Sequence, residues 1–359
     1  MVKSTKLFRG IPNKREFLAQ AFGRLGILGL MERVSATWRP GLVVLTYHRI
    51  AEPGAGPFYD PVISATPESF RAQIDWLRTH VRILTLDELV AWVETGSPAR
   101  ELVALVTFDD GYRDNFDVAV PILRAGNVPA TFFIPTAFLD SPRLPWWDHV
   151  AYAIKQTRAR RLMLERNRNG DAPPLVIDLD LVPRTEAIMT IIRAFLDESI
   201  ADDRWFLDQL AARAEVDMDA ESLGRALFMT WDQVRQLADS NAGLTIGSHG
   251  HSHHRLARLD DDSQRYELAE SKRILEARLG REVAAMAYPY GWPGTYTAQT
   301  KALAAGAGYR LAFASREGTN RPGILDRYEL SRLGVGSGDS PALLRARTAL
   351  HAAFGKSFL

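Results

Sequence analysis

The chain has 359 residues, of which 46% are hydrophobic and 24% are charged, and its net charge is +1. This length and composition indicate a large globular enzyme-sized domain, and the near-neutral charge gives no indication of a nucleic-acid-binding protein. Because the chain contains no cysteine, disulfides and thiolate metal sites are excluded, and any metal site must use histidine and carboxylate ligands.

Residues 1–40 form a basic segment that includes an apolar stretch at 17–31. Eight lysines and arginines against two glutamates give this segment a net charge of +6. No secretory signal and no apolar run of membrane-spanning length is visible, so we expect a cytoplasmic protein. Residues 1–35 could bind peripherally to the anionic inner face of the membrane. The alternative is a helix that packs on the main domain with its basic side in solvent.

Apolar runs and helical patterns alternate along residues 41–335, which predicts parallel strands joined by helices in a sheet or barrel. The expected strands lie at 43–50, 102–106, 129–135, 244–248, 283–288, 311–315 and 330–335. The first expected helix begins at 66. The others lie at 87–94, 115–125, 231–240, 262–279, 297–305 and 341–354. The last of these helices belongs to a C-terminal segment at 336–359. Residues 140–228 interrupt the alternation, and we interpret them as a mainly helical insertion that could cap a cleft.

Two adjacent aspartates follow the apolar run at 102–106, in the sequence Thr107-Phe108-Asp109-Asp110-Gly111. Neighbouring residues of a strand point to opposite faces, so both carboxylates can reach one place only where the strand ends in a turn. Two buried carboxylates repel each other unless a cation or hydrogen bonds intervene. A metal ion would offset this repulsion, so we expect one to bind at this strand end.

Four histidines follow a second short apolar run, in the sequence Ser248-His249-Gly250-His251-Ser252-His253-His254. His249 and His253 are four residues apart, a spacing that puts both rings on one face of a helical turn. Two imidazoles and one carboxylate make a ligand set suited to a divalent ion such as zinc, with open positions for water and substrate. The alternative is a solvated histidine-rich loop.

At these motifs the chain resembles the polysaccharide deacetylase family, the carbohydrate esterases that share the NodB homology domain. The family's first motif, Thr-Phe-Asp-Asp-Gly, matches residues 107–111. Its second motif, His-Ser/Thr followed three residues later by His, matches His249 and His253, with Gly250 in place of the hydroxyl residue. The motif layout is most similar to the poly-N-acetylglucosamine deacetylase branch.

The resemblance implies a deformed (β/α) barrel over residues 41–335. It also implies roles for the motif residues: Asp109 is the general base, and Asp110, His249 and His253 hold the metal. In the family, water activated by the metal attacks an N-acyl carbonyl. Zinc is the preferred ion here, and cobalt, nickel and manganese suit the same ligands.

A third motif, Tyr288-Pro289-Tyr290-Gly291, ends another apolar run and is similar to the family's Arg-x-Pro-Tyr motif. The resemblance implies that the backbone N–H of Tyr290 contributes to an oxyanion hole, and we expect Tyr288 and Pro289 to contact substrate. The arginine of the family motif is absent, because Ala287 occupies its position.

The general acid of the family usually comes from a C-terminal Leu-x-His motif, where this chain has Leu330-Ser331-Arg332. In the branch named above, a Tyr-His pair on an N-terminal strand supplies the acid instead, and His48 follows Tyr47 in this way. We therefore predict His48 as the general acid and Arg332 as a partial substitute for the missing arginine, orienting Asp109. The alternatives are a structural strand-end histidine and an arginine at the surface or in a salt bridge.

The expected insertion opens with Trp146-Trp147-Asp148. Paired tryptophans near an active-site rim suit stacking on sugar rings, and related deacetylases often carry Trp-Asp at this point. We predict that these three residues bind substrate, and core packing is the alternative for either tryptophan.

Together these features predict a hydrolase of carbon–nitrogen bonds in linear amides, specifically a carbohydrate N-deacetylase of the cell envelope. The expected substrate is an N-acetylated amino sugar, with formyl as the less favoured acyl group, in an exopolysaccharide or other surface polysaccharide or in its lipid-linked precursor. The missing arginine and histidine favour a rival hypothesis, a carbohydrate-binding protein on the same barrel that has lost turnover. A hydrolase of non-sugar amides is a third.

Overall fold

The computed structural model describes residues 41–96, 101–140, 144–197, 200, 202–240, 242–318, 320–321 and 325–354. The expectations for residues 1–40 lie outside this part of the chain. The contact pattern separates two units, of which the second comprises Pro53–Val62 and Ser141–Phe228 and the first holds the remaining described residues. Within the described residues, no helix is both long enough and apolar enough to cross a bilayer.

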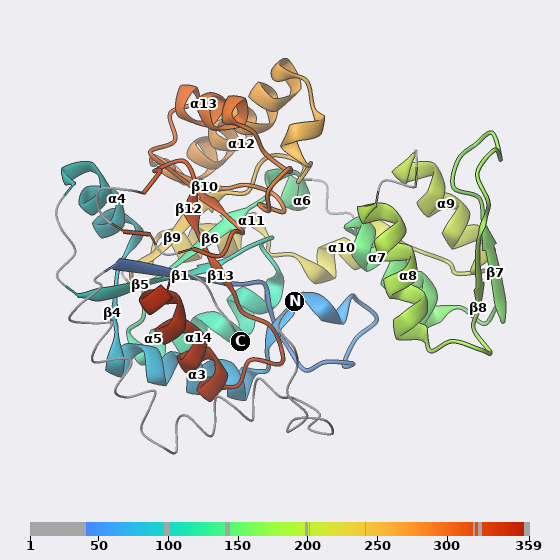
Figure 1. Ribbon diagram of the computed structural model, residues 1–359, viewed down its shortest axis with the longest axis horizontal. Helices are drawn as coiled ribbons and strands as arrows, with labels where there is room; N and C mark the ends of the chain where they lie inside the picture. Colours follow the sequence, from blue (N-terminus) through green and yellow to red (C-terminus); the bar gives the residue numbers. More distant parts are fainter. Residues whose placement is uncertain are drawn as a thin grey trace. The chain divides into compact units, whose positions relative to one another are not determined.

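The first unit is built around one sheet whose strand pairs are all parallel (Figure 1). Its described strands are β1 (Gly41–Tyr47), β4 (Arg82–Ile83), β5 (Leu102–Phe108), β6 (Ala130–Ile134), β9 (Leu244–Ser248), β10 (Ala285–Ala287), β11 (Leu311–Ala314), β12 (Leu330–Ser331) and β13 (Leu333–Gly334). They lie in the order β12-β11-β10-β9-β6-β5-β1-β13, with β4 beside β5.

The two ends of this sheet are carried by consecutive residues of the chain. β12 pairs with β11 and β13 pairs with β1, and only Arg332 separates β12 from β13. The sheet therefore curves into a nearly closed barrel. This arrangement confirms the predicted (β/α) barrel class.

Helices surround the strands, with α12 and α13 on one side and α3, α5 and α14 on another in Figure 1. Their bounds are α3 (Pro67–His80), α4 (Leu86–Thr95), α5 (Val120–Gly126), α6 (Thr136–Asp140), α11 (Trp231–Ala238), α12 (Asp261–Leu279), α13 (Ala298–Gly306) and α14 (Pro341–Phe354). A π-helical stretch, Asn115–Ala119, leads into α5, and short elements complete the unit: β2 (Arg49–Ile50), β3 (Ile63–Ala65) and the 3-10 turn Leu256–Arg258. Threonine N-caps fix the starts of several helices, including Thr66, Thr85, Thr230 and Thr297.

Side chains on the two faces of the strands belong to two separate apolar clusters. Outward-facing residues such as Tyr47, Phe108 and Phe132 pack under the surrounding helices. The smaller inner cluster combines the starts of the strands with residues of α4, including Leu42, Val103, Leu311, Leu86 and Leu89. Helix α4 therefore closes the end of the barrel where the strands begin, and the opposite end, where the strands stop, remains for a functional site.

Gly247 illustrates how tightly the barrel interior is filled. A Cβ atom at this position would lie 2.4 Å from the Phe133 ring and 3.1 Å from the Ala285 carbonyl oxygen. The glycine of β9 therefore allows Phe133 to occupy the inside of the barrel just below the end of the strands.

The second unit consists of α7 (Trp146–Gln156), β7 (Arg161–Leu164), β8 (Leu175–Asp178), α8 (Arg184–Leu196), α9 (Asp203–Arg213), α10 (Ala220–Leu227) and the turn Asp60–Val62. β7 and β8 form an antiparallel hairpin. The loop at 53–62 belongs to this unit because Lys155 donates to the Phe58 carbonyl (2.6 Å) and pairs with Asp60 (3.0 Å). The sequence did not predict that this early loop packs with the insertion.

Candidate active site and metal centre

The carboxyl ends of the parallel strands bring the motif residues to one end of the barrel. The Asp109 N–H donates to the Tyr47 carbonyl (2.9 Å), so Asp109 follows β5 directly beside His48 at the end of β1. The His249 N–H donates to the Ile134 carbonyl (2.9 Å), which fixes His249 at the end of β9. Residues from distant parts of the sequence thus meet because their strands are parallel and end at the same edge of the sheet.

Three motif residues have left-handed backbone conformations. Asp110 has φ 70°, His253 has φ 60° and Tyr290 has φ 63°, and they are three of the five non-glycine residues with positive φ in the described part of the chain. A non-glycine residue in this region costs about 1–3 kcal/mol and persists where surrounding structure imposes it. The strain is concentrated at the strand ends that carry the site.

The left-handed turn at Asp110 explains how two adjacent aspartates reach one place. Asp109 still follows the direction of β5, and the chain reverses at Asp110 and Gly111, which have φ 70° and 69°. The predicted turn at the strand end is present, and it begins at the second aspartate, one residue before the glycine. A Cβ at Gly111 would lie 3.2 Å from Ile134.

The segment between His249 and His253 is a loop, so the expected helical turn is wrong. Gly250 has φ 74° and His253 has φ 60°, and neither lies in the helical region. The loop nevertheless brings the two imidazole rings within 4.9 Å of each other. The spacing of four residues was informative, but the physical cause of the convergence is a pair of left-handed residues.

Asp110, His249 and His253 form a group whose potential ligand atoms all lie within 4.8 Å of one another. Asp110 Oδ1 lies 3.3 Å from His253 Nε2 and 3.5 Å from His249 Nε2. All three side chains are buried, and this Oδ1 has no hydrogen bond of acceptable geometry among the described residues. A buried carboxylate oxygen facing two imidazole nitrogens is what a divalent cation requires, so the residues fit a metal.

The orientation of His249 suits a ligand. Its Nδ1 lies 2.8 Å from the Ala287 carbonyl oxygen, so Nδ1 carries the proton and Nε2 is left to act as the donor atom toward a metal. Burial lowers the pKa of His249 to about 4, which keeps the ring neutral at pH 7. Burial would raise the pKa of Asp110, but His253 outweighs this and holds it well below its usual range.

Asp109 is paired with Arg332, and its Oδ2 also lies 3.8 Å from His249 Nε2. The two terminal guanidinium nitrogens of Arg332, Nη1 and Nη2, donate to Asp109 Oδ1 and Oδ2 at 2.8 Å each, and Nη2 also donates to Ser315 Oγ at 3.2 Å. Both side chains are buried. Burial alone would raise the pKa of Asp109, but the charge of Arg332, with His249 and His48, lowers it below its usual value. The carboxylate is therefore ionised and fixed in orientation.

The remaining motif residues lie around this group. His48 is close enough for its charge to lower the pKa of both aspartates, and its backbone is fixed by Ser64 (2.9 Å) and Asn115 (2.6 Å). The Tyr290 ring lies 4.9 Å from the His253 ring. The roles predicted for His48 and Tyr290 remain predictions.

Tyr288 and Pro289, which we predicted to bind substrate, are both buried. Tyr288 stacks on Tyr296 with ring centroids 4.5 Å apart and donates to the Tyr328 carbonyl at 2.9 Å. Pro289 lies next to Gly250, where a Cβ would come within 3.3 Å of Pro289 Cγ. Their contacts support the neighbouring loops, and substrate contact is untested.

The residues Trp146, Trp147 and Asp148 pack within the second unit. Trp146 stacks on Phe195 with ring centroids 4.6 Å apart, and Trp147 is 7% exposed. Asp148 is fully buried and accepts the Tyr59 N–H at 2.7 Å. These contacts are those of the core-packing alternative, and the predicted role in binding sugar remains a prediction.

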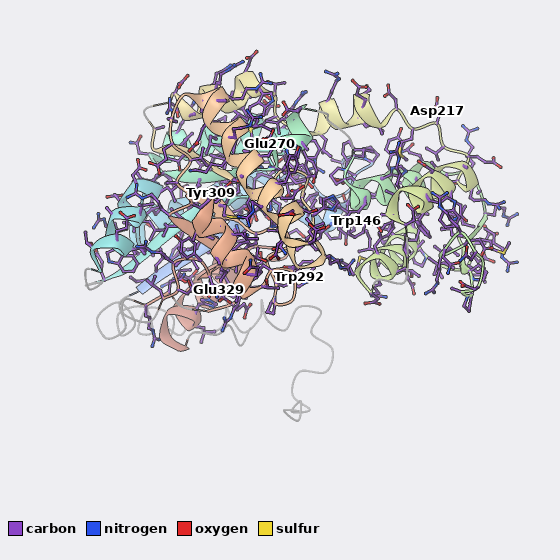
Figure 2. The ribbon with its side chains drawn as sticks, turned by 90° about the horizontal axis from the view of Figure 1, so that it is seen from above. Trp146, Asp217, Glu270, Trp292, Tyr309 and Glu329 are labelled. Atoms are coloured by element: carbon purple, nitrogen blue, oxygen red, sulfur yellow. The ribbon has the colours of Figure 1, made fainter. Side chains whose placement is uncertain are left out.

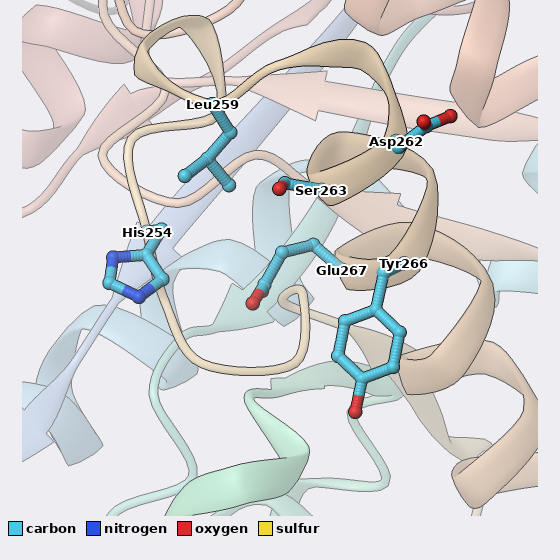
Figure 3. Close-up of a pocket in the computed structure, with 6 residues that line it drawn as sticks. All are labelled: His254, Leu259, Asp262, Ser263, Tyr266 and Glu267. Atoms are coloured by element: carbon cyan, nitrogen blue, oxygen red, sulfur yellow. The ribbon is translucent and has the colours of Figure 1, made fainter.

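Glu267 is a site residue that no sequence motif marks. It extends from α12 toward the histidine loop, beside a surface hollow of about 400 Å³ that His254 and Tyr266 also line (Figure 3). Its carboxylate accepts the N–H groups of His251 (3.0 Å) and Ser252 (2.8 Å), and also the Ser252 hydroxyl. Glu267 therefore fixes the loop between the two histidines. These charge-assisted hydrogen bonds stabilise the left-handed backbone conformation of the loop.

The fold and the site together define a class: a barrel hydrolase with a candidate metal centre and a separate ionised carboxylate beside it. The sequence model of the polysaccharide deacetylase family matches residues 96–163 and 192–312, more than half of the chain. The chain belongs to the polysaccharide deacetylase family. This membership confirms the predicted family and supports the predicted class, carbohydrate N-deacetylase.

Individual relatives agree with this assignment. The poly-β-1,6-N-acetyl-D-glucosamine N-deacetylase of Staphylococcus epidermidis is 35% identical over 79 residues, which are 22% of this chain and span only 27% of that protein. The deacetylase PplD of Streptococcus pyogenes, solved in complex with acetate, aligns with a TM-score of 0.55 and 19% identity over 85% of this chain and 97% of its own. IcaB of Ammonifex degensii aligns with a TM-score of 0.54 and 20% identity over 86% and 97%. The two structural matches show the shared fold.

Proposed function

We propose that this chain is a metal-dependent N-deacetylase that removes acetyl groups from N-acetylglucosamine units of a surface polysaccharide or its lipid-linked precursor. The observation that carries the proposal is the separation of two aspartates by function. The Asp110 carboxylate faces His249 and His253, whereas the Asp109 carboxylate forms an ion pair with Arg332. The named activity of the Staphylococcus epidermidis relative supports poly-N-acetylglucosamine as the substrate.

Asp110, His249 and His253 would hold the metal, and zinc is our first choice because its usual ligands are imidazole and carboxylate. Bound there, a divalent ion would supply Lewis acidity toward the acyl oxygen and lower the pKa of water in the site. The further chemistry falls to the side chains around it.

Asp109 accepts the proton of the attacking water. It can do so at neutral pH because Arg332 keeps it ionised, and the two-point contact leaves the carboxylate in one orientation. The Tyr290 N–H donates to the acyl oxygen as negative charge develops there. His48 donates a proton to the departing amine, and an imidazole has a suitable intrinsic pKa for this step.

The Asp109–Arg332 pair also bears on the rival hypothesis of a binding protein without turnover. That hypothesis depended on the missing arginine at Ala287 and the missing C-terminal histidine. Arg332 provides a buried guanidinium contact to the base, and His48 lies near both aspartates. A protein that only binds sugar has no evident need for a buried, oriented and ionised base beside a metal site.

Acetate release tests the proposal. We expect the purified protein to release acetate from β-1,6-linked N-acetylglucosamine oligomers, to lose this activity with a chelator, and to regain it when zinc is added. Binding of the oligomers without acetate release would support the binding protein instead. Release from simple N-acetyl amides but not from sugars would support the amidase alternative.

The role of His48 can be tested separately. We expect His48→Ala to lower kcat by about 10²–10⁴-fold, the usual contribution of a general acid, without changing the metal content. Elemental analysis and the rate of acetate release measure the two effects. An unchanged kcat would exclude His48 as the acid.

A further inference from the structure

Trp292, labelled in Figure 2, is an exposed tryptophan two residues after Tyr290. It is 41% exposed, and no other tryptophan in the described ranges is exposed to this extent. Single exposed apolar side chains are common on protein surfaces. Because a lone exposed ring carries little information, its surroundings decide what it could bind.

A chain of aromatic contacts connects Trp292 to the ligand group. The buried His253 ring lies 4.9 Å from the half-buried Tyr290 ring, which lies 5.1 Å from the exposed Trp292 ring. Trp292 is therefore at most about 10 Å from a metal ligand by ring centroid. A sugar residue adjoining the one that reacts, in the same polymer, can span this distance.

The backbone holds Trp292 in a rigid turn. The Thr295 N–H donates to the Trp292 carbonyl at 3.1 Å, and the Thr295 hydroxyl donates to the same oxygen at 2.7 Å. Pro293 and Gly294 occupy the two central positions, and Gly294 has φ 93°, as a type II turn requires. The ring is thus presented in water on a loop that is already ordered, so binding a ligand costs little loop entropy.

Tyr290 itself offers less surface to a ligand, because the Arg255 guanidinium lies over its ring at 5.1 Å. Of these two neighbouring rings, Trp292 is the more exposed to solvent. Its face suits a flat ligand with an apolar C–H surface and polar edges, which describes a pyranose ring.

We propose that Trp292 is a stacking platform for a neighbouring sugar residue of the chain whose acetyl group is being removed. The inference rests on the proposed function and refines it. The enzyme then acts on oligomers or polymers, and recognition improves once the substrate is long enough to cover Trp292.

The test compares Trp292→Ala with the wild-type protein on the disaccharide and the pentasaccharide of β-1,6-linked N-acetylglucosamine. We expect KM for the pentasaccharide to rise about tenfold, with kcat and metal content unchanged and with little effect on the disaccharide. Trp292→Phe should restore most of the loss, because a smaller ring still stacks. The matched control is Trp92→Ala on α4, at the closed end of the barrel, which should show no dependence on substrate length.

Failure of this inference is distinguishable from failure of the proposed function. Equal KM values for Trp292→Ala and wild type at both lengths would contradict the stacking platform alone. Calorimetric titration of the zinc-loaded protein with the fully deacetylated pentasaccharide provides a readout that does not depend on turnover. If no acetate is released from any oligomer, the proposed function is wrong, and the calorimetric affinities of Trp292→Ala and wild type still decide the platform.

Discussion

Replacing Asp109 with asparagine should abolish turnover while metal binding survives. An amide cannot accept the proton of the attacking water, so we expect kcat to fall by about 10²–10⁴-fold. The proposed ligands Asp110, His249 and His253 are unchanged, so zinc affinity should remain close to that of the wild type. Acetate release at saturating zinc and isothermal titration with zinc measure the two effects. Retained turnover would remove Asp109 from its role.

The same substitution should also destabilise the fold, because it leaves the buried Arg332 charge without its carboxylate. Removing one partner of a buried ion pair costs about 3–5 kcal/mol. A control must therefore reproduce the loss of a buried Arg–carboxylate pair away from the site. Asp339→Asn does so, since Asp339 is 9% exposed and is paired with Arg347. This control should lower the melting temperature and keep turnover.

Replacing Arg332 with methionine should shift the pH dependence of catalysis. Burial raises the pKa of Asp109 and Arg332 is the strongest influence that lowers it. Without the guanidinium, Asp109 becomes protonated nearer to neutral pH, so the acid limb of kcat/KM moves to higher pH and activity recovers as pH rises. Arg332→Lys should shift the limb less, because it keeps the charge and loses the two-point contact.

The stability of Arg332→Met should show the matching pH dependence. In the wild type the pKa of Asp109 is below its unfolded value, so the pair stabilises the fold above that value and the effect is lost as pH falls through the folded pKa. In the variant the pKa is raised, which favours the fold at low pH. The difference in melting temperature should therefore be largest near neutrality and shrink toward about pH 3. An equal difference at all pH values would contradict the account, and Arg347→Met is the matched control.

Much of the barrel was predictable because its strands are continuous apolar runs with chemical residues at their ends. The run at 102–106 and Asp109-Asp110 identify β5 and its carboxylates, and β9 with its histidines follows the same logic. The capped helices were also predictable, because threonine caps and apolar faces are local signals. Helix α14, expected at 341–354, has these bounds in the structure.

Other features depend on contacts between distant residues and leave no local signal. The left-handed backbone at Asp110 and His253 arises from the strand ends that surround them, so the spacing of the histidines suggested a helical turn instead. Glu267 looks like an ordinary charged residue of an amphipathic helix. Strand β7 lies in a polar, basic stretch and is ordered by pairing with β8. Tertiary structure overrides local propensity in each case.

The position of Arg332 between β12 and β13 has a consequence for the order of events during synthesis. The guanidinium that pairs with Asp109 belongs to the segment that joins the two edges of the sheet. A nascent chain that has not yet emerged as far as residue 332 has neither the pairing of β13 with β1 nor this cation. We therefore expect a polypeptide truncated before Arg332 to leave Asp109 without its buried counter-charge, even where Asp110, His249 and His253 already lie together.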